Sequence, residues 1–254
     1  MLAAYELQTQ RLLQNPGAPQ SLYAKSDIDS WVNTARGQIA GEGNAIRVFG
    51  TINTVVGQRV YNFSSINLGT PASTGIAGVI HVRSILYSLG TGQQAITRQG
   101  WEWFNWYYQN NPVPMPGPPQ NWSQFAQGAS GQGTGSAASG SFYLDNPPDL
   151  VYRLSCDCVC YPTNLVDDTT VEALPYLWSD CVPFFAAWYA LLSSQTGART
   201  ADAEKMFKNY QMFLDRARQL SNPDPERWLY QQSGDPTQAN KLGMQQPRAA
   251  GGGG

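Results

Sequence analysis

The stretch that decides the fold is PYLWSDCVPFFAAWYALL at residues 175–192, together with TADAEKMFKNYQMFLDRARQL at residues 200–220. The first is apolar on all sides, which predicts a central, fully buried helix that Pro183 could kink. The second carries one apolar stripe at helical spacing, the strongest amphipathic signal in the chain. The stripe consists of Met206, Phe207, Tyr210, Phe213, Leu214, Ala217 and Leu220.

Two further helices are predicted at the start of the chain. Residues 2–14 form a short helix that Asn15-Pro16-Gly17 ends. A clearer helix begins near Ser26 and carries an apolar stripe of Ile28, Trp31, Val32, Ala35 and Ile39. Four short helices can share a core only by packing together, so the two chain ends are expected to form one helical bundle.

The residues between these helices are rich in β-branched and aromatic side chains, which indicates strands. Residues 48–56 and 59–63 predict a hairpin across Gly57-Gln58, and residues 79–89 predict a strand paired with 93–98. Further strands are predicted at 122–127, 142–145 and 150–160, and a short helix at 101–109. The proline-rich residues 112–119 predict an extended connector, and the Gly- and Ser-rich residues 128–141 a flexible loop.

The predicted fold class is α+β, with a four-helix bundle from both chain ends, an inserted antiparallel β-rich domain and an extended C-terminal arm. The bundle is assigned to residues 1–44 and 162–222, the β-rich domain to 45–161 and the arm to 223–254. The arm is polar apart from Trp228, Leu229 and Tyr230, so it cannot offset its own ordering entropy. It is therefore expected to be disordered or to fold against a partner.

Composition narrows the classes of function. Charged residues make up 13% of the chain, about half the usual share, and aromatic residues 12%. Such a surface is either committed to neighbouring proteins or polar without charge, because Gln, Asn, Ser and Thr are plentiful. The net charge of −2 argues against a DNA-reading protein but permits one that DNA slides past. No membrane span or signal peptide is expected, and the cysteines are expected to be reduced in a cytosol.

The residues that could carry chemistry have simpler structural roles. His81 is the only histidine and lies in a predicted strand, where pairing on a sheet face accounts for it. Cys156, Cys158 and Cys160 alternate, which predicts a strand with small side chains facing the core; zinc binding with Cys181 is the alternative. The carboxylate pairs Asp167-Asp168 and Asp224-Glu226 are interpreted as helix caps, and Gly131-x-Gly133-x-Gly135 lacks a phosphate-binding context. No catalytic residue, metal or cofactor is therefore predicted.

A run of aromatic residues is the strongest candidate for contact with other molecules. Trp101, Trp103, Trp106 and Tyr107 are candidates for subunit or tail contacts, with Phe104 and Tyr108 beside them. Alternatively, these rings form core at the open end of the β-rich domain, or they are a stacking platform for a glycan.

Several segments resemble the head-to-tail adaptor (connector) proteins of tailed bacteriophages. The similar segments are residues 174–195 and 201–210, which include both C-terminal helices. Residues 30–36 with Gly41-Glu42-Gly43 look like the N-terminal helix of that family, and Phe142-Tyr143-Leu144 before Pro147-Pro148-Asp149 looks like its late β-hairpin. The resemblance spans most of residues 21–220.

The resemblance implies a structural, non-enzymatic virion protein of the neck, assembled in the host cytoplasm. It implies a homo-oligomeric ring of about 12 copies between the portal protein and a tail (nozzle or tail tube) protein. Double-stranded DNA would pass through the lumen without sequence-specific binding. The arm would dock on the portal, and we offer Trp228, Leu229 and Tyr230 as its anchors.

The residues leave two further functions open. One is a tail or baseplate component whose β-rich domain binds a host glycan through the aromatic residues of 101–108. The second is a metal-binding protein built on the cysteine strand.

Overall fold

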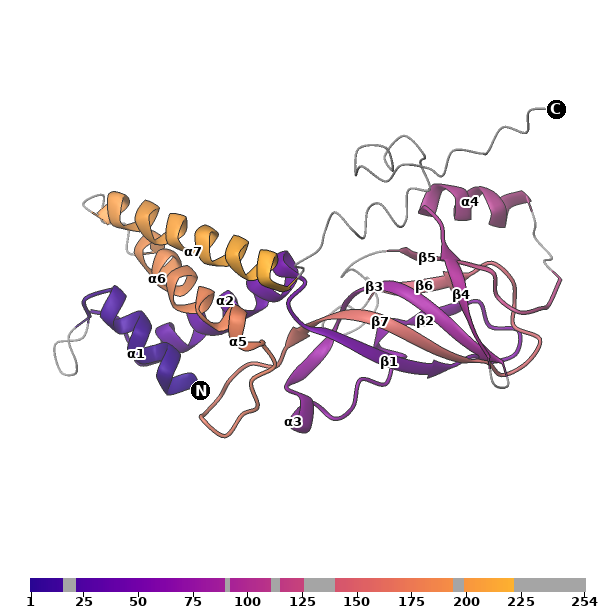
Figure 1. The fold of residues 1–254 in the computed structure, drawn as a ribbon, viewed down its shortest axis with the longest axis horizontal. Coiled ribbons are helices and arrows are strands. Elements are labelled where there is room, and N and C mark those ends of the chain that lie inside the picture. Colours follow the sequence, from indigo (N-terminus) through magenta and orange to yellow (C-terminus); the bar gives the residue numbers. More distant parts are fainter. Residues whose placement is uncertain (16–21, 90–91, 111–114, 126–139, 194–198, 222–254) are drawn as a thin grey trace, which may run out of the picture.

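The computed structural model describes residues 1–15, 22–89, 92–110, 115–125, 140–193 and 199–221. A group of helices lies against one end of a curled, seven-stranded sheet (Figure 1). The strand order is β1-β7-β3-β4-β5-β6-β2. The strands are β1 (Arg47–Asn53), β2 (Val60–Asn62), β3 (Ile76–Leu89), β4 (Gly92–Arg98), β5 (Asn121–Phe125), β6 (Ser141–Leu144) and β7 (Arg153–Pro162).

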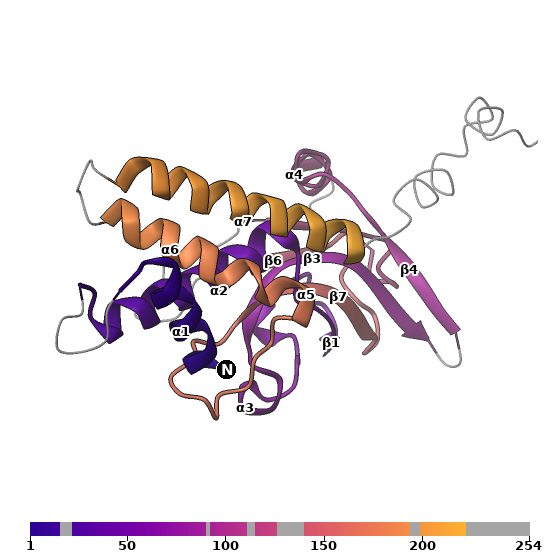
Figure 2. The same ribbon diagram turned by 60° about the vertical axis from the view of Figure 1, so that its left-hand side comes forward.

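The helical group contains elements from both ends of the chain, and α6 and α7 run side by side (Figure 2). Its members are α1 (Leu2–Leu12), α2 (Lys25–Gly43), α5 (Tyr176–Ser179), α6 (Cys181–Ser193) and α7 (Thr200–Ser221). On α7 the predicted stripe faces inward at Tyr210, Leu214 and Ala217, which are buried. Two short helices, α3 (Pro71–Thr74) and α4 (Trp101–Asn110), and a 3-10 turn at Phe63–Ser65 belong to the sheet region.

The predicted architecture of a four-helix bundle with an inserted antiparallel domain is wrong. The curled sheet dominates the molecule, and only the broad α+β class is compatible with it. One hydrophobic core runs from Ile28 and Val32 on α2 to Cys156 and Cys158 on β7. The prediction fails because the apolar stripe of α2 does not serve helix packing alone: α2 also packs against β7. The division into the predicted domains stays a prediction, and the arm at 223–254 lies outside the described residues.

The sheet also departs from the prediction in its pairing. Residues 48–56 and 59–63 do not form a hairpin: β1 pairs with β7 and β2 pairs with β6, at opposite ends of the strand order. Moreover, β4 and β5 are parallel, so the sheet is not purely antiparallel. Gly57 does support a turn, with φ +80°. Long-range pairing, however, decides which strands β1 and β2 pair with on either side of that turn.

Other elements are confirmed close to their expected positions. The strands β3 and β4 form the predicted antiparallel pair, and α4 is helical as expected. The apolar stretch of residues 175–192 is helical but interrupted at Asp180, so Pro183 lies in the first turn of α6, where its missing N–H is tolerated. Nor is α6 fully buried, because Tyr189 and Leu192 are 43% and 51% exposed.

A buried ion pair ties the helices to the segment that follows β7. Arg36 on α2 is fully buried, and its Nη2 lies 2.8 Å from Oε1 of Glu172. The same guanidinium donates to the carbonyl oxygen of Thr163 at 2.7 Å and to Oδ1 of Asn33 at 3.0 Å. Because every partner is fixed, this cluster sets how the segment 163–175 runs over α2.

Candidate functional site

The helix α4 brings the predicted aromatic candidates together over β5 and β6. The ring of Trp101 lies 4.4 Å from that of Phe125 and 4.8 Å from that of Tyr143, measured between centroids. Trp103 stacks on Tyr107 at 5.2 Å. Trp101, Trp103 and Tyr107 therefore have ring partners within the protein, and their packing attaches α4 to the sheet.

Polar contacts hold the end of α4 in place. The hydroxyl of Tyr108 donates to the carbonyl oxygen of Leu144 at 2.8 Å, and that of Tyr107 donates to Oδ1 of Asn146 at 3.1 Å. The guanidinium of Arg59 lies 3.5 Å from the ring centroid of Tyr108. Burial raises the pKa of Tyr108 to about 12. These contacts attach the end of α4 to the segment that includes β6 and to Arg59.

Trp106 is the exception among the four candidates, because its side chain is 62% exposed. It lies on the outer face of α4, opposite the buried Phe104. An exposed tryptophan on a helix that is attached to the sheet is suited to contact another molecule.

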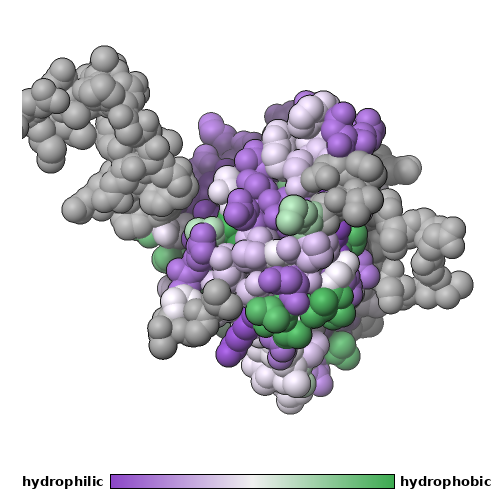
Figure 3. Space-filling view, turned by 90° about the vertical axis from the view of Figure 1, so that its right-hand side faces the viewer, coloured by the Kyte–Doolittle hydropathy of each residue, from purple (hydrophilic) through white to green (hydrophobic). Residues whose placement is uncertain are grey.

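A second surface, which sequence reasoning missed, lies at the end of the sheet remote from α2. It consists of four side chains that are 55–65% exposed: Val55, Val56, Leu150 and Val151. We call this set the sheet tip. Figure 3 shows hydrophobic side chains gathered on this end of the molecule. The missed signal is a pair of apolar residues beside each turn, Val55-Val56 and Leu150-Val151. The prediction treats both pairs as ordinary positions of the strands at 48–56 and 150–160.

The sheet tip is held by backbone contacts between its two segments. The N–H of Thr54 donates to the carbonyl oxygen of Tyr152 at 2.8 Å, and that of Gly57 to the carbonyl oxygen of Pro148 at 2.9 Å. The buried hydroxyl of Tyr61 accepts from the N–H of Val55 at 3.0 Å. The exposed apolar side chains therefore stand on an ordered frame, which lowers the entropy cost of binding.

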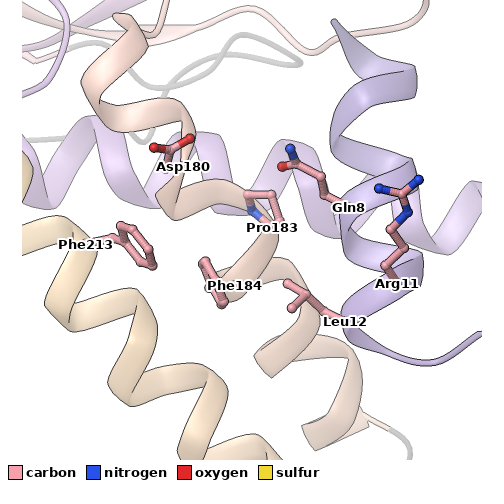
Figure 4. A pocket seen from close by; sticks show the side chains of 7 residues that line it. All are labelled: Gln8, Arg11, Leu12, Asp180, Pro183, Phe184 and Phe213. Atoms are coloured by element: carbon pink, nitrogen blue, oxygen red, sulfur yellow. The ribbon is translucent and has the colours of Figure 1, made fainter.

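A third surface is a groove on the helical group, formed by two adjoining hollows of about 340 and 210 Å³ that share Asp180 and Phe213. We call it the helical groove; Figure 4 shows its larger hollow. Phe184 of α6 stacks on Phe213 of α7 at 5.0 Å inside it. The apolar lining residues are Leu12, Tyr176, Leu177, Pro183, Phe184, Phe213, Ala217 and Leu220.

The predicted roles of the cysteines and His81 can be placed in the structure. Cys156, Cys158 and Cys160 are fully buried on β7, which confirms the interpretation as core. Burial raises the pKa of the Cys156 and Cys160 thiols to about 12. His81 is half-buried on β3 opposite Val159, and burial lowers its pKa, with a smaller contribution from nearby arginines. Across the described ranges, no group of three or more His, Cys, Asp or Glu side chains could hold a metal ion.

The carboxylate pair at Asp167-Asp168 also has a structural role. The pair lies in the segment between β7 and α5 and not at the boundary of a neighbouring helix, but Oδ1 of Asp168 accepts the N–H of Ala3 at 2.9 Å at the start of the distant helix α1. Asp167 accepts the N–H groups of Thr169 and Thr170 in its own turn. The residues Gly131, Gly133, Gly135, Asp224, Glu226, Trp228, Leu229 and Tyr230 lie outside the described residues.

Comparison with known proteins adds no relative to this description. No protein-family model matches the chain, and the search of curated proteins finds no match. Among the helices that the structure describes, none combines the length and apolar character needed to cross a membrane.

Proposed function

We propose that the chain is a structural, non-enzymatic subunit of a head-to-tail adaptor ring in the neck of a tailed bacteriophage. The observation that supports this proposal is the presence of two separate surfaces with exposed apolar side chains: the sheet tip and the helical groove, which Gln8, Arg11, Asp180 and Arg216 also line. They lie on different parts of the molecule. The helical groove is on the helices, whereas the sheet tip follows the far end of β1, which leads away from the end of α2. A subunit with separate neighbours needs such separate surfaces.

The two surfaces divide the proposed contacts. The helical groove serves the neighbouring copy in the ring, since a head-to-tail contact joins unlike surfaces and closes when the rotation per subunit divides a full turn. The sheet tip and Trp106 serve the tail protein. The residues Trp228, Leu229 and Tyr230 serve the portal, and DNA passes through the lumen without being read.

The proposal is tested by electron microscopy of the purified protein, alone and with portal and tail protein. Wild-type protein is expected to give rings, with or without portal as template. Leu220→Asp, in the helical groove, is expected to prevent rings, because it places a charge in an apolar contact. Val56→Asp, in the sheet tip, is expected to leave rings intact but to prevent attachment of the tail.

A matched control and a contrary outcome complete the experiment. Val166→Asp alters an exposed side chain outside both surfaces and is expected to behave as wild type. Truncation after Asn222 is expected to abolish portal binding while leaving the fold intact. A chain that stays monomeric alone and in the presence of portal, or a truncated chain that still binds portal, would contradict the proposal.

The glycan-binding alternative retains one supporting observation, the exposed ring of Trp106. A flat sugar platform uses several accessible rings, whereas Trp101, Trp103 and Tyr107 pack against other rings. A glycan array separates the two functions: an adaptor shows no sugar binding, and binding that is lost in Trp106→Ala would favour the alternative.

A further inference from the structure

A polar pocket of about 360 Å³ lies at the seam between the sheet and the helices. Three arginines from three different elements line it: Arg47 from β1, Arg83 from β3 and Arg218 from α7. The only acidic lining residue is Glu42, although Asp157 and Asp215, which are not among the lining residues, form ion pairs with Arg47 and Arg218. Such a concentration of arginine is not explained by the proposed contacts with portal, tail or neighbouring copies.

Two of the arginines are positioned by ion pairs and hydrogen bonds to nearby residues. Nη2 of Arg47 lies 2.9 Å from Oδ2 of Asp157. Arg218 donates through Nη1 to Oδ1 of Asp215 at 3.1 Å and through Nη2 to the carbonyl oxygen of Glu42 at 2.9 Å. A guanidinium has five N–H donors, so both side chains keep donors for another acceptor.

Arg83 differs from the other two. It is half-buried, and within the described ranges it has neither an ion-pair partner nor a hydrogen-bond acceptor. Glu42 is the acidic lining residue, but within the described ranges it forms no ion pair with Arg83, and its oxygens accept the hydroxyl of Tyr210 at 2.7 Å and Nε2 of Gln38. Arg83 therefore offers the pocket a guanidinium with unused hydrogen-bond donors.

The rest of the lining comes mainly from the turn after α2 and from Trp178. Asn44 holds a left-handed conformation, with φ +50°, and turns the chain from α2 towards β1. Gly43 packs so closely on the ring of Trp178 that a Cβ would lie 2.3 Å from Cζ3. Because three arginines line the same small pocket, it favours a compact anion that several forked donors can share.

We propose that this pocket binds a phosphate-type oxyanion, with Arg83 as the main ligand and Arg47 and Arg218 as supporting ligands. The same chemistry could come from free inorganic phosphate or from a phosphodiester of a nucleic acid backbone. The site does not depend on the adaptor function, and neither does its test.

The test is calorimetric titration of the full chain with potassium phosphate, with potassium chloride at equal ionic strength as the reference. Phosphate is expected to bind and chloride is not. Arg83→Gln is expected to weaken phosphate binding by at least about tenfold, because a charged hydrogen-bond donor is lost. Arg83→Lys keeps the charge but loses the fork, so an intermediate loss is expected.

The control is Arg153→Gln, which removes an exposed arginine of β7 outside the pocket and should leave phosphate binding unchanged. Competition with a short DNA duplex identifies the source: displacement of phosphate indicates a backbone phosphodiester, and its failure indicates free phosphate. Equal responses to phosphate and chloride would overturn the proposal. Unchanged phosphate binding in folded Arg83→Gln would also overturn it. If Arg83→Gln does not fold, unchanged phosphate binding in Arg83→Lys decides against the proposal instead.

Discussion

At the scale of single residues, the buried pair of Arg36 and Glu172 is expected to be sensitive to substitution. Arg36→Met is expected to lower the free energy of unfolding by about 3–5 kcal/mol, because it leaves the carboxylate of Glu172 buried without its partner. Urea denaturation measures the change. The double variant Arg36→Met/Glu172→Gln should recover part of the loss, since the uncompensated charge is gone.

A surface pair provides the contrast to this prediction. Lys25 is exposed and contacts Glu6 and Asp29. Lys25→Gln is expected to change the free energy of unfolding by less than about 1 kcal/mol, because exposed pairs are screened by water and salt. A comparable loss in both variants would show that Arg36 does not act through its buried charge.

The four thiols make a second prediction at this scale, on pH dependence. Burial raises the pKa of Cys156, Cys160 and Cys181 from 9.0 to about 12, and Cys158 is raised further. The unfolded chain therefore loses thiol protons at lower pH than the folded chain. Stability from these groups is complete below about pH 9 and falls above it, by about 1.4 kcal/mol per thiol per pH unit.

Thiol titration checks this prediction. An aromatic disulfide reagent at pH 8 is expected to react with all four cysteines in urea and with none in the native protein. Denaturant midpoints at pH 8 and pH 10.5 should show the loss of stability. Rapid labelling of the native protein, or a midpoint that does not fall with rising pH, would contradict the burial of the cysteine strand.

At the scale of elements, two glycines at the end of α2 give a matched pair. Gly43→Ala places a methyl group against Trp178 and is expected to cost about 1–3 kcal/mol. Gly41→Ala meets nothing within 4 Å and is expected to stabilise the helix by about 0.5–1 kcal/mol. Thermal unfolding followed by circular dichroism measures both, and opposite signs are the required result.

The helix α4 gives another element-scale prediction. Trp101→Ala is expected to lower stability by about 2–3 kcal/mol, because it removes the ring that contacts Phe125 and Tyr143. Trp106→Ala, on the exposed face, is expected to change stability by less than about 0.5 kcal/mol. If both variants were equally stable, α4 would not be held by its inner aromatic face.

Elements defined by local periodicity could be predicted from the sequence, whereas their partners could not. The helices α2, α4 and α7 and the strands β3, β4 and β7 lie near the predicted positions because apolar spacing and breakers act over a few residues. The pairing of β1 with β7 depends on residues about a hundred positions apart, and no local pattern encodes it. For the same reason, the clustered aromatic residues of α4 could be recognised as contact candidates from the sequence. The sheet tip and the pocket lined by Arg47, Arg83 and Arg218 could not.

At the scale of the whole molecule, the shared core predicts cooperative unfolding. Helix α2 contributes apolar side chains to the same core as β7 and β3, so neither part buries its apolar face alone. We expect far-ultraviolet circular dichroism and tryptophan fluorescence to report one coincident transition in urea. Two separated transitions would show that the predicted bundle and β-rich segments fold independently.

The divergence of β1 and β2 has one further consequence, for solubility. The strands β1 and β2 are the first and last in the strand order, although a short link joins them in sequence. The backbone of Thr51 in β1 exchanges two hydrogen bonds with Asn67, which follows β2 in sequence. Amide and carbonyl groups on the rim of the sheet at β1 are thereby occupied from within the chain. The chain is protected at that point against amyloid-like stacking, in which an exposed rim templates the addition of strands from other molecules.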